Sequence, residues 1–343
     1  MCRSAAPAAC LRYWNRESET TLSKLRAVAP GLRALATVAM LAVLLTRMHV
    51  TRLFPSHRQS EVALLAVALV VTLSGIGLSV LRWHRVLLAL GLATKVRTLF
   101  RLYLAGLFVG NFLPSTVGGD VVRVSRLAKI TRQRPGAFAS VVLERLTGWL
   151  VLPVITLVGL LINPALLQLG SASRLAIAVS LGTLALLALV VALAGSARLG
   201  RLLSGREGWA RFASAVHLGL ARFRHRPGAA AGVLLVSFAY QLVVALGAFL
   251  VALAIGLHVG WTAIVAFMPV VAIVQILPLT IGGLGLREGA FVVFLKPLGV
   301  TASQAIAFGL LVYGLNLAVS LLGAPAFAAG VVSGRAVRAD PDP

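Results

Sequence analysis

The chain has 343 residues, of which 59% are hydrophobic and only 12% are charged, and its mean hydropathy is +0.96. This composition excludes an ordinary soluble domain and predicts an all-α polytopic membrane protein. The formal net charge of +23 does not indicate nucleic-acid binding, because the 32 Lys and Arg residues lie between apolar segments rather than on one basic domain. We expect these residues to set the topology and to contact anionic lipid.

The N-terminal part of the chain predicts a basic tail and two membrane spans. Residues 1–33 are polar and basic, so the positive-inside rule places them in the cytoplasm. The apolar segment that follows reaches the ~20 residues needed to cross a bilayer only if it covers 34–54, with Arg47 and Arg52 snorkelling. A stronger span is predicted at 61–81, after which Arg82 and Arg85 begin a basic cytoplasmic loop.

A break interrupts the next apolar segment, 102–122, within the sequence Leu113-Pro-Ser-Thr-Val-Gly-Gly-Asp-Val-Val-Arg123. Pro114 removes a backbone donor, and Gly118 and Gly119 tolerate positive φ angles, so a helix is expected to break here. Both flanks are strongly basic, and a complete crossing would place one basic cluster outside the cell. The segment is therefore predicted to be a re-entrant hairpin that opens to the cytoplasm.

The middle of the chain predicts two further spans, 137–162 and 175–194, followed by a basic cytoplasmic linker, 195–227. Apolar residues recur in this linker at helical spacing, at Trp209, Phe212, Val216, Leu220 and Phe223. Two placements fit such a helix: it lies in the lipid headgroup layer, or it packs on the transmembrane bundle.

The broken motif returns after a span at 228–256. The sequence Leu277-Pro-Leu-Thr-Ile-Gly-Gly-Leu-Gly-Leu-Arg287 repeats Leu, Pro, Thr, Gly, Gly and Arg at the same spacing, with Pro278 and the Gly282-Gly283 pair at the break. The last span, 301–332, must end in the cytoplasm beside a short basic tail, 335–343, so the second motif region is predicted to begin and end outside. Three spans separate the motifs, and the two hairpins are therefore expected to enter from opposite sides as an inverted repeat, within about six spans in all.

Acidic residues are rare, yet three lie in or beside apolar segments, where an ionisable group costs about 2.5–3.5 kcal/mol. Each has an arginine nearby: Asp120 with Arg123, Glu144 with Arg145, and Glu288 with Arg287. The N-termini of the helices that follow the breaks favour binding of an anion, and arginine side chains can bind a phosphate through two hydrogen bonds at once. We predict a headgroup-phosphate site made of Arg123, Arg287 and the four break glycines, in which Asp120, Glu144, Arg145 and Glu288 act as charge partners or exchange protons.

A purely structural interpretation competes with this one. Asp120 is then an N-cap, Arg123 and Arg287 snorkel, and Glu144-Arg145 and Arg287-Glu288 are pairs that lock packing. Asn111 and Gln275 precede the two motifs and are expected to form interhelical hydrogen bonds. Five aromatic residues are expected in the interfacial belt or the core: Trp83, Tyr103, Trp149, Trp261 and Tyr313. The two cysteines lie in the N-terminal tail, and no catalytic motif, cofactor motif or metal-ligand spacing is found in the sequence.

Three stretches together resemble the lysylphosphatidylglycerol synthase transmembrane family, also called flippase-like domain proteins: the sequence from Asn111 to Arg123, Val141-Val-Leu-Glu-Arg145, and the sequence from Leu277 to Glu288. The similarity covers roughly residues 30 to 335 and implies a flippase-like membrane domain at 34–334. In bifunctional members this region is thought to flip aminoacylated phosphatidylglycerol, and a soluble aminoacyltransferase domain follows. This chain stops at Pro343, so we expect that synthase activity to be absent and the lipid substrate to be open.

The leading hypothesis is a translocase that moves a phosphate-bearing lipid or glycolipid across the bacterial inner membrane, with both termini in the cytoplasm. Its ligands are anionic or phosphate-bearing membrane lipids, and enzymes of lipid or glycolipid synthesis are candidate partners. One alternative is a membrane-embedded transferase with Asp120 or Glu288 as general base. Another is a non-catalytic scaffold for a cell-envelope synthesis pathway.

Overall fold

The computed structural model describes residues 59–112, 118–195, 207–276, 280 and 283–328, which are helical with short connections and contain no strand. The α-helices are α2 (Gln59–Ala89), α3 (Val96–Phe112), α4 (Gly118–Thr131), α5 (Arg134–Ile162), α6 (Ser171–Gly195), α8 (Glu207–His225), α9 (Pro227–Ala254), α10 (Trp261–Val274), α11 (Leu286–Leu295), α12 (Ala302–Leu321) and α13 (Ala324–Ala328). Two 3₁₀ helices, η2 (Pro164–Gln168) and η4 (Lys296–Leu298), lie in connections. The predicted all-α class is confirmed.

Five of the described helices are long and apolar enough to cross a membrane: α2, α5, α6, α9 and α12. They correspond to five of the predicted spans, and the remaining one, 34–54, lies outside the described residues. The boundary at residue 81 was wrong, because α2 continues to Ala89 and buries Arg82 instead of delivering it to a loop. The last span is also shorter than predicted, since α12 ends at Leu321 and the short α13 follows.

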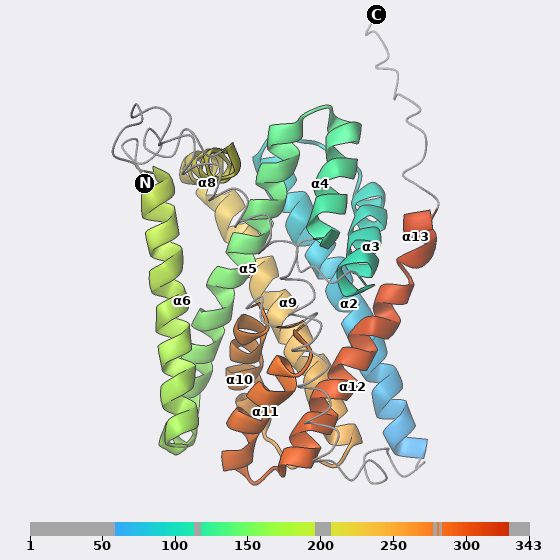
Figure 1. Ribbon diagram of the computed structural model, residues 1–343, viewed down its shortest axis with the longest axis vertical. Helices are drawn as coiled ribbons and strands as arrows, with labels where there is room; N and C mark the ends of the chain where they lie inside the picture. The colour runs from blue at the N-terminus through green and yellow to red at the C-terminus, as the bar shows by residue number, and fades with distance from the viewer. Residues whose placement is uncertain (1–58, 113–117, 196–206, 277–279, 281–282, 329–343) are drawn as a thin grey trace, which may run out of the picture.

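Two pairs of shorter helices enter the bundle from opposite ends (Figure 1). α3 and α4 form a hairpin in the half of the molecule drawn at the top, and α10 and α11 form one in the half drawn at the bottom. With 14 residues, α10 is only about 21 Å long, which is shorter than the ~30 Å hydrocarbon core of a bilayer. A helix of this length is too short to cross a bilayer by itself, as a re-entrant hairpin requires.

Helix packing relates the two halves of the chain. α4 packs on α3 and α5, and α11 packs correspondingly on α10 and α12. In addition, α10 packs against α5 while α3 packs against α12, so each hairpin contacts the crossing helix that follows the other hairpin. This reciprocal packing is the arrangement expected of an inverted repeat.

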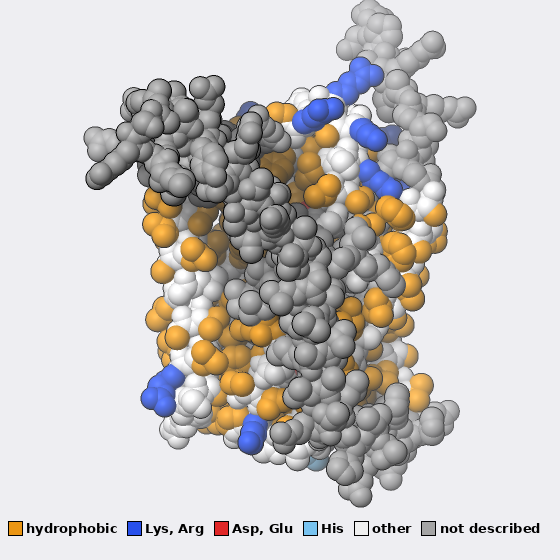
Figure 2. Space-filling view, viewed as in Figure 1, with side chains coloured by type: hydrophobic (Ala, Val, Ile, Leu, Met, Phe, Trp, Pro, Cys, Tyr) orange, Lys and Arg blue, Asp and Glu red, His pale blue; other side chains and the backbone are white. Residues whose placement is uncertain are grey.

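Apolar side chains form two buried clusters, one for each hairpin. The cluster beside α10 and α11 contains Phe267 stacked on Phe294 with ring centroids 5.2 Å apart. The other contains Trp83 and Leu127 and lies among α2, α3, α4 and α5. Among the coloured residues of Figure 2, hydrophobic side chains predominate between the two ends of the molecule, and the visible Lys and Arg side chains lie towards those ends. This distribution is that of a protein surrounded by lipid.

Glycines let α3 and α4 approach each other closely. A Cβ atom on Gly119 of α4 would lie 2.2 Å from the carbonyl oxygen of Gly106 on α3 and 3.3 Å from the Cα atom of Gly110. Gly106 and Gly110 form a GxxxG pattern, which is common where membrane helices touch backbone to backbone. The same crossing lets the aliphatic part of Arg123 pass over Gly106, because a Cβ there would be 2.7 Å from the Arg123 Cγ.

The basic linker contains α8, which lies across the end of the bundle beside α6 (Figure 1) and packs against α5, α6 and α9. Val216 is buried, whereas His217 and Arg222 are exposed. A Cβ on Gly219 would overlap the side chain of Leu143 on α5, so the contact with α5 is close. Of the two predicted placements, the structure shows packing on the bundle.

The glycine crossing gives a test of the first hairpin. We expect Gly119→Ala to lower the free energy of unfolding by about 1–3 kcal/mol, because the new methyl group meets backbone atoms that cannot move without separating α3 from α4. Gly77→Ala on α2 is the matched control, since a Cβ there has no neighbour within 4 Å. Thermal unfolding in detergent measures both, and equal midpoints would contradict the close crossing.

Candidate functional site

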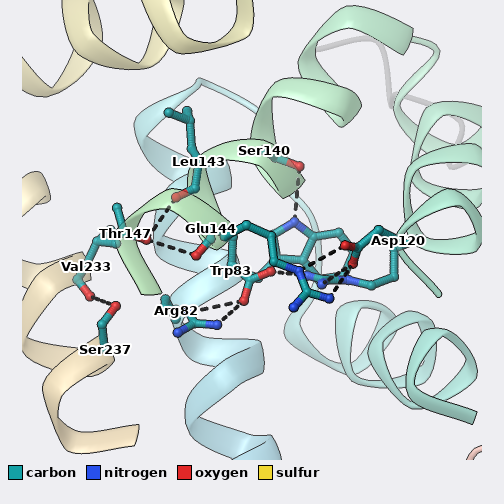
Figure 3. A network of polar contacts seen from close by, with 11 residues as sticks. Arg82, Trp83, Asp120, Ser140, Leu143, Glu144, Thr147, Val233 and Ser237 are labelled. Atoms are coloured by element: carbon teal, nitrogen blue, oxygen red, sulfur yellow. Dashed lines mark hydrogen bonds and ion pairs between the residues drawn. The ribbon is translucent and has the colours of Figure 1, made fainter. Parts of the chain in front are cut away.

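Glu144 is the centre of a buried ion-pair cluster. Its carboxylate is 1% exposed and lies in α5, where it accepts hydrogen bonds from two arginines on other helices (Figure 3). Arg82 on α2 donates from Nε to Oε1 at 3.1 Å and also from Nη2, and Arg123 on α4 donates from Nη2 to Oε2 at 2.8 Å. One carboxylate thus joins α2, α4 and α5.

Asp120 is the second carboxylate of this cluster. It lies in the first turn of α4, which begins at Gly118, so it is not the N-cap that the structural interpretation proposed. Arg145 donates to it from Nε at 2.9 Å and from Nη2 at 3.1 Å, and Arg123 donates from Nη1 at 3.3 Å. The expected pair between Glu144 and Arg145 is wrong, because Arg145 pairs with Asp120 while Glu144 pairs with Arg82 and Arg123.

Aromatic rings hold the Arg123 guanidinium in place. Its Cζ lies 4.1 Å from the ring centroid of Trp83 and 4.7 Å from that of Tyr103. Trp83 is fully buried and donates from Nε1 to Ser140 Oγ at 3.1 Å. Cation–π contacts of this kind are strongest where water is excluded, so the rings fix the side chain at depth.

Arg82 is a member of this cluster that the sequence interpretation missed. Its guanidinium lies 5.1 Å from the ring centroid of Tyr240 on α9. Gly148 on α5 leaves room for it, since a Cβ there would lie 3.0 Å from Arg82 Nη1. The only signal in the sequence was its place directly after an apolar segment, which is also where basic residues that set topology occur.

Two polar groups of the first hairpin lack partners among the described residues. Arg123 is only 4% exposed, and its Nε has no hydrogen-bond partner there. The Nδ2 of Asn111, near the end of α3, is likewise buried without one. Buried donors of this kind are costly and call for an explanation, and a bound acceptor is one.

The second motif contains an ion pair between two adjacent residues. Arg287 donates to Glu288 Oε1 from Nε at 3.0 Å and from Nη2 at 2.5 Å, while Glu288 Oε2 accepts the Gly285 N–H at 2.6 Å. The Arg287 Cζ lies 4.6 Å from the ring centroid of Tyr313. This pairing confirms the expected Arg287–Glu288 pair, and the burial of Arg123 and Arg287 excludes snorkelling for both.

The chain reverses sharply before α11. Gly283 and Gly285 have φ angles of +72° and +83°, which only glycine adopts readily. A Cβ on Gly283 would also lie 3.0 Å from the Cβ of Gln275, so the turn packs against the end of α10. Pro114, Pro278 and Gly282 fall outside the described residues, and Gly118 and Gly119 are in the first turn of α4.

The ion pairs of the predicted residues fall into two groups. Asp120, Arg123, Glu144 and Arg145 come together in the first half, whereas Arg287 and Glu288 lie in the second, and no ion pair between described residues joins the two. Within the described part of the chain, no group of three His, Cys, Asp or Glu residues is placed to hold a metal ion.

These features define a multi-pass membrane protein with buried arginine–carboxylate sites at two opposed broken hairpins. Residues 31–323 match the family described as lysylphosphatidylglycerol synthase TM region, and the chain belongs to this family. A search of curated proteins finds no significant match. The family ties the protein to lipid synthesis or lipid flipping at a membrane.

Removal of one carboxylate tests the cluster. We expect Glu144→Gln to destabilise the protein by about 3–5 kcal/mol, because two buried guanidinium groups lose their charge partner. Asp120→Asn is the comparison, with an expected cost of about 0.2–1 kcal/mol, since the nearer of its two partners, Arg145, is 48% exposed in its side chain and the other, Arg123, keeps its bond to Glu144. Thermal unfolding measures both variants, and a larger loss for Asp120→Asn would contradict the central position of Glu144.

Proposed function

We propose that the protein is a translocase that moves a phosphate-bearing lipid between the leaflets of the bacterial inner membrane. The observation that carries this proposal is Arg123, a buried arginine in the second turn of a half-helix, with one donor unpartnered among the described residues. An ionisable side chain at such depth is costly and usually marks a transport pathway.

The surroundings of Arg123 suit a phosphate. α4 begins at Gly118, so the positive end of its dipole lies one to two turns from the guanidinium. The guanidinium donates at present to two carboxylates, Glu144 and Asp120, and a phosphate presents the same kind of acceptor oxygens. A headgroup phosphate that takes over one of these contacts leaves the remaining carboxylate to balance the arginine.

The opposed hairpins place one buried arginine on each side of the proposed lipid pathway. The hairpin of α3 and α4 enters from one end of the bundle, and the hairpin of α10 and α11 enters from the other (Figure 1). Each contains a buried arginine shortly after the break, Arg123 or Arg287, held by an acid and an aromatic ring. Such a pair of sites supports alternating access, in which the headgroup passes from one arginine to the other.

The contacts of the two acids favour transport over the transferase alternative. That alternative requires Asp120 or Glu288 as a general base, yet Asp120 accepts from Arg123 and Arg145, and Glu288 accepts from Arg287 and a backbone N–H. Both carboxylates are therefore engaged in holding arginines. The scaffold alternative gives no role to the Arg123 donor that is unpartnered among the described residues.

The proposed orientation places the end that contains α8 in the cytoplasm. In a chain with Cys2 and Cys10 replaced by Ser, we expect Ala93→Cys, in the exposed connection before α3, to react with an impermeant maleimide only after the membrane is opened. Ala165→Cys, in η2 at the other end, is the matched variant and is expected to react in intact cells. The reverse pattern would overturn the orientation.

Neutral substitutions test transport itself. We expect Arg123→Gln and Arg287→Gln each to reduce translocation of a fluorescent phospholipid in reconstituted vesicles by roughly 10- to 150-fold, as the loss of a charged hydrogen bond of about 1.5–3 kcal/mol predicts. Arg97→Gln, at the exposed start of α3, is the control and is expected to transport normally. Dithionite quenching of the outer leaflet measures the rate, and unchanged rates in both variants would contradict the proposal.

A further inference from the structure

One arginine holds the short helix α13 against the first hairpin. Arg126 lies in α4, one turn after Arg123. Its guanidinium donates from Nη1 to the Ala326 carbonyl oxygen at 3.2 Å and from Nη2 to the Phe327 carbonyl oxygen at 3.1 Å. The last carbonyls of a helix have no partner within the helix, and a basic side chain can satisfy them. The first hairpin is thereby bonded to a helix about 200 residues further along the chain.

Aromatic rings and a glycine complete this contact. The Arg126 Cζ lies 5.2 Å from the ring centroid of Phe327, and that ring lies 6.0 Å from the ring of Phe108 on α3. Gly323 is in the turn between α12 and α13, and a Cβ there would overlap the carbonyl oxygen of Leu104 on α3. We call these contacts of Gly323 and α13 with Leu104, Phe108 and Arg126 the α13 contact.

The helix that leads into α13 also packs on the second arginine. A Cβ on Gly309 of α12 would lie 3.2 Å from Glu288 Cγ, so the backbone of α12 lies directly against this acid. Tyr313, one turn later, places its ring centroid 4.6 Å from the Arg287 Cζ. The continuous segment 302–328 therefore contacts the Arg287–Glu288 pair through α12 and the first hairpin through the α13 contact.

The same segment contributes to both apolar clusters. Phe308 and Val312 of α12 belong to the cluster beside α10 and α11. Val319, two turns after Val312, belongs to the cluster that contains Trp83 and Leu127. Because packed interiors leave little free space, a displacement of α12 changes the packing in both halves of the protein.

Neither arginine is open to water in this structure, since Arg123 is 4% exposed and Arg287 is 6% exposed. A headgroup reaches either one only after helices move apart. Phe327 is 41% exposed and Arg126 is only partly buried, whereas Glu144, which holds α4 to α5, is 1% exposed. Contacts near the surface open at a lower cost than buried ion pairs do. We therefore expect the α13 contact to open before the Glu144 cluster does.

We propose that Arg126 is a positioning residue that holds the first hairpin closed against α13, and that segment 302–328 couples the opening of this hairpin to the second arginine. This inference rests on the proposed function and adds the regulation of its two sites. In Figure 1, α3 and α11 lie on the same side of α12 and α13, and both pack on this segment. A rigid helix that tilts about its contacts with α2 and α9 moves its ends in opposite directions. Departure of α13 from α3 then moves the other end of α12 toward α11, so opening of the first site closes the second.

Cysteine labelling of the full chain in nanodiscs tests the coupling, because both faces of the membrane are then accessible. The reporters are Leu107→Cys, on α3 one turn after Tyr103, and Leu284→Cys, in the turn before α11, each with Cys2 and Cys10 replaced by Ser. Leu107 and Leu284 are both half-buried. The rate of reaction with a small methanethiosulfonate therefore reports the access of water to each hairpin.

Two variants loosen the α13 contact: Arg126→Gln, which removes the donors to α13, and Phe327→Ala, which removes the ring. Arg126→Lys keeps a cationic donor and is the conservative variant. Lys129→Gln is the matched control, because Lys129 is exposed in the last turn of the same helix and takes no part in the α13 contact. Phe327 is partly exposed, so its truncation is expected to leave the fold intact.

We expect Arg126→Gln to raise the labelling rate of Leu107→Cys roughly tenfold, the lower limit for loss of a hydrogen bond to a charged group. The rate of Leu284→Cys is expected to fall at least about fivefold, the low end of typical coupling between two sites. Phe327→Ala should act in the same directions, Arg126→Lys should recover most of the parent rates, and Lys129→Gln should match them. An unchanged rate at Leu284→Cys would overturn the coupling. So would a rise at both reporters, which is the result of a general loosening of the fold.

A reversible crosslink tests the α13 contact within one folded protein. Phe108→Cys and Phe327→Cys, in the chain without Cys2 and Cys10, are joined by a short bifunctional methanethiosulfonate after reconstitution. We expect translocation of the fluorescent phospholipid to be lost on crosslinking and to return on reduction. A monofunctional reagent on the same pair is the control and should leave transport in place. Undiminished transport in the crosslinked protein would overturn the proposal that the α13 contact opens.

The results separate this inference from the proposed function. Coupled labelling together with normal transport in Arg123→Gln and Arg287→Gln would support the coupling and overturn the translocase. Transport lost in those two variants, with uncoupled labelling and undiminished transport in the crosslinked protein, would overturn the coupling and leave the translocase intact.

Discussion

The pairing of buried guanidinium groups with Glu144 is the interaction on which the first half of the protein depends. Charges removed from water are tolerated only when they are paired and hydrogen-bonded, and Glu144 satisfies this for Arg82 and Arg123 at once. Because these residues come from α2, α4 and α5, the ion pairs fix the position of the broken hairpin relative to two crossing helices. The aromatic rings of Trp83 and Tyr103 complete the enclosure.

Close backbone packing also fixes the position of the broken hairpin. α4 packs closely on α3 because Gly119 meets Gly106 without side chains between them. Gly106 also leaves room for the aliphatic part of the Arg123 side chain, whose guanidinium binds Glu144. In the second half, glycines with positive φ angles turn the chain so that Glu288 caps α11 and holds Arg287. Both halves thus hold a buried arginine, but with different partners. The first half uses a cluster of three arginines and two carboxylates, and the second uses a neutral pair of adjacent residues.

Much of this organisation was predictable from the sequence. Composition gave the class, the loop charges and span count gave opposed hairpins, and the rarity of acids within apolar segments identified Asp120, Glu144 and Glu288. The partners were not predictable, because Arg82 and Glu144 are 62 residues apart and only the fold brings them together. Arg82 also had the pattern of a topology signal. Adjacency in the sequence does not decide pairing either, because Arg145 binds Asp120 whereas Arg287 binds its neighbour Glu288.

The most direct test of the central claim is a distance measured between the Arg123 guanidinium and a lipid phosphorus. Protein with ¹⁵N-labelled arginine side chains, reconstituted in phosphatidylglycerol bilayers, permits this by ¹⁵N–³¹P dipolar dephasing in solid-state NMR. A dephased side-chain signal at hydrogen-bonding range that disappears in Arg123→Lys but persists in Arg97→Lys is the predicted result. Dephasing that is unchanged in Arg123→Lys would show that no lipid phosphate binds there.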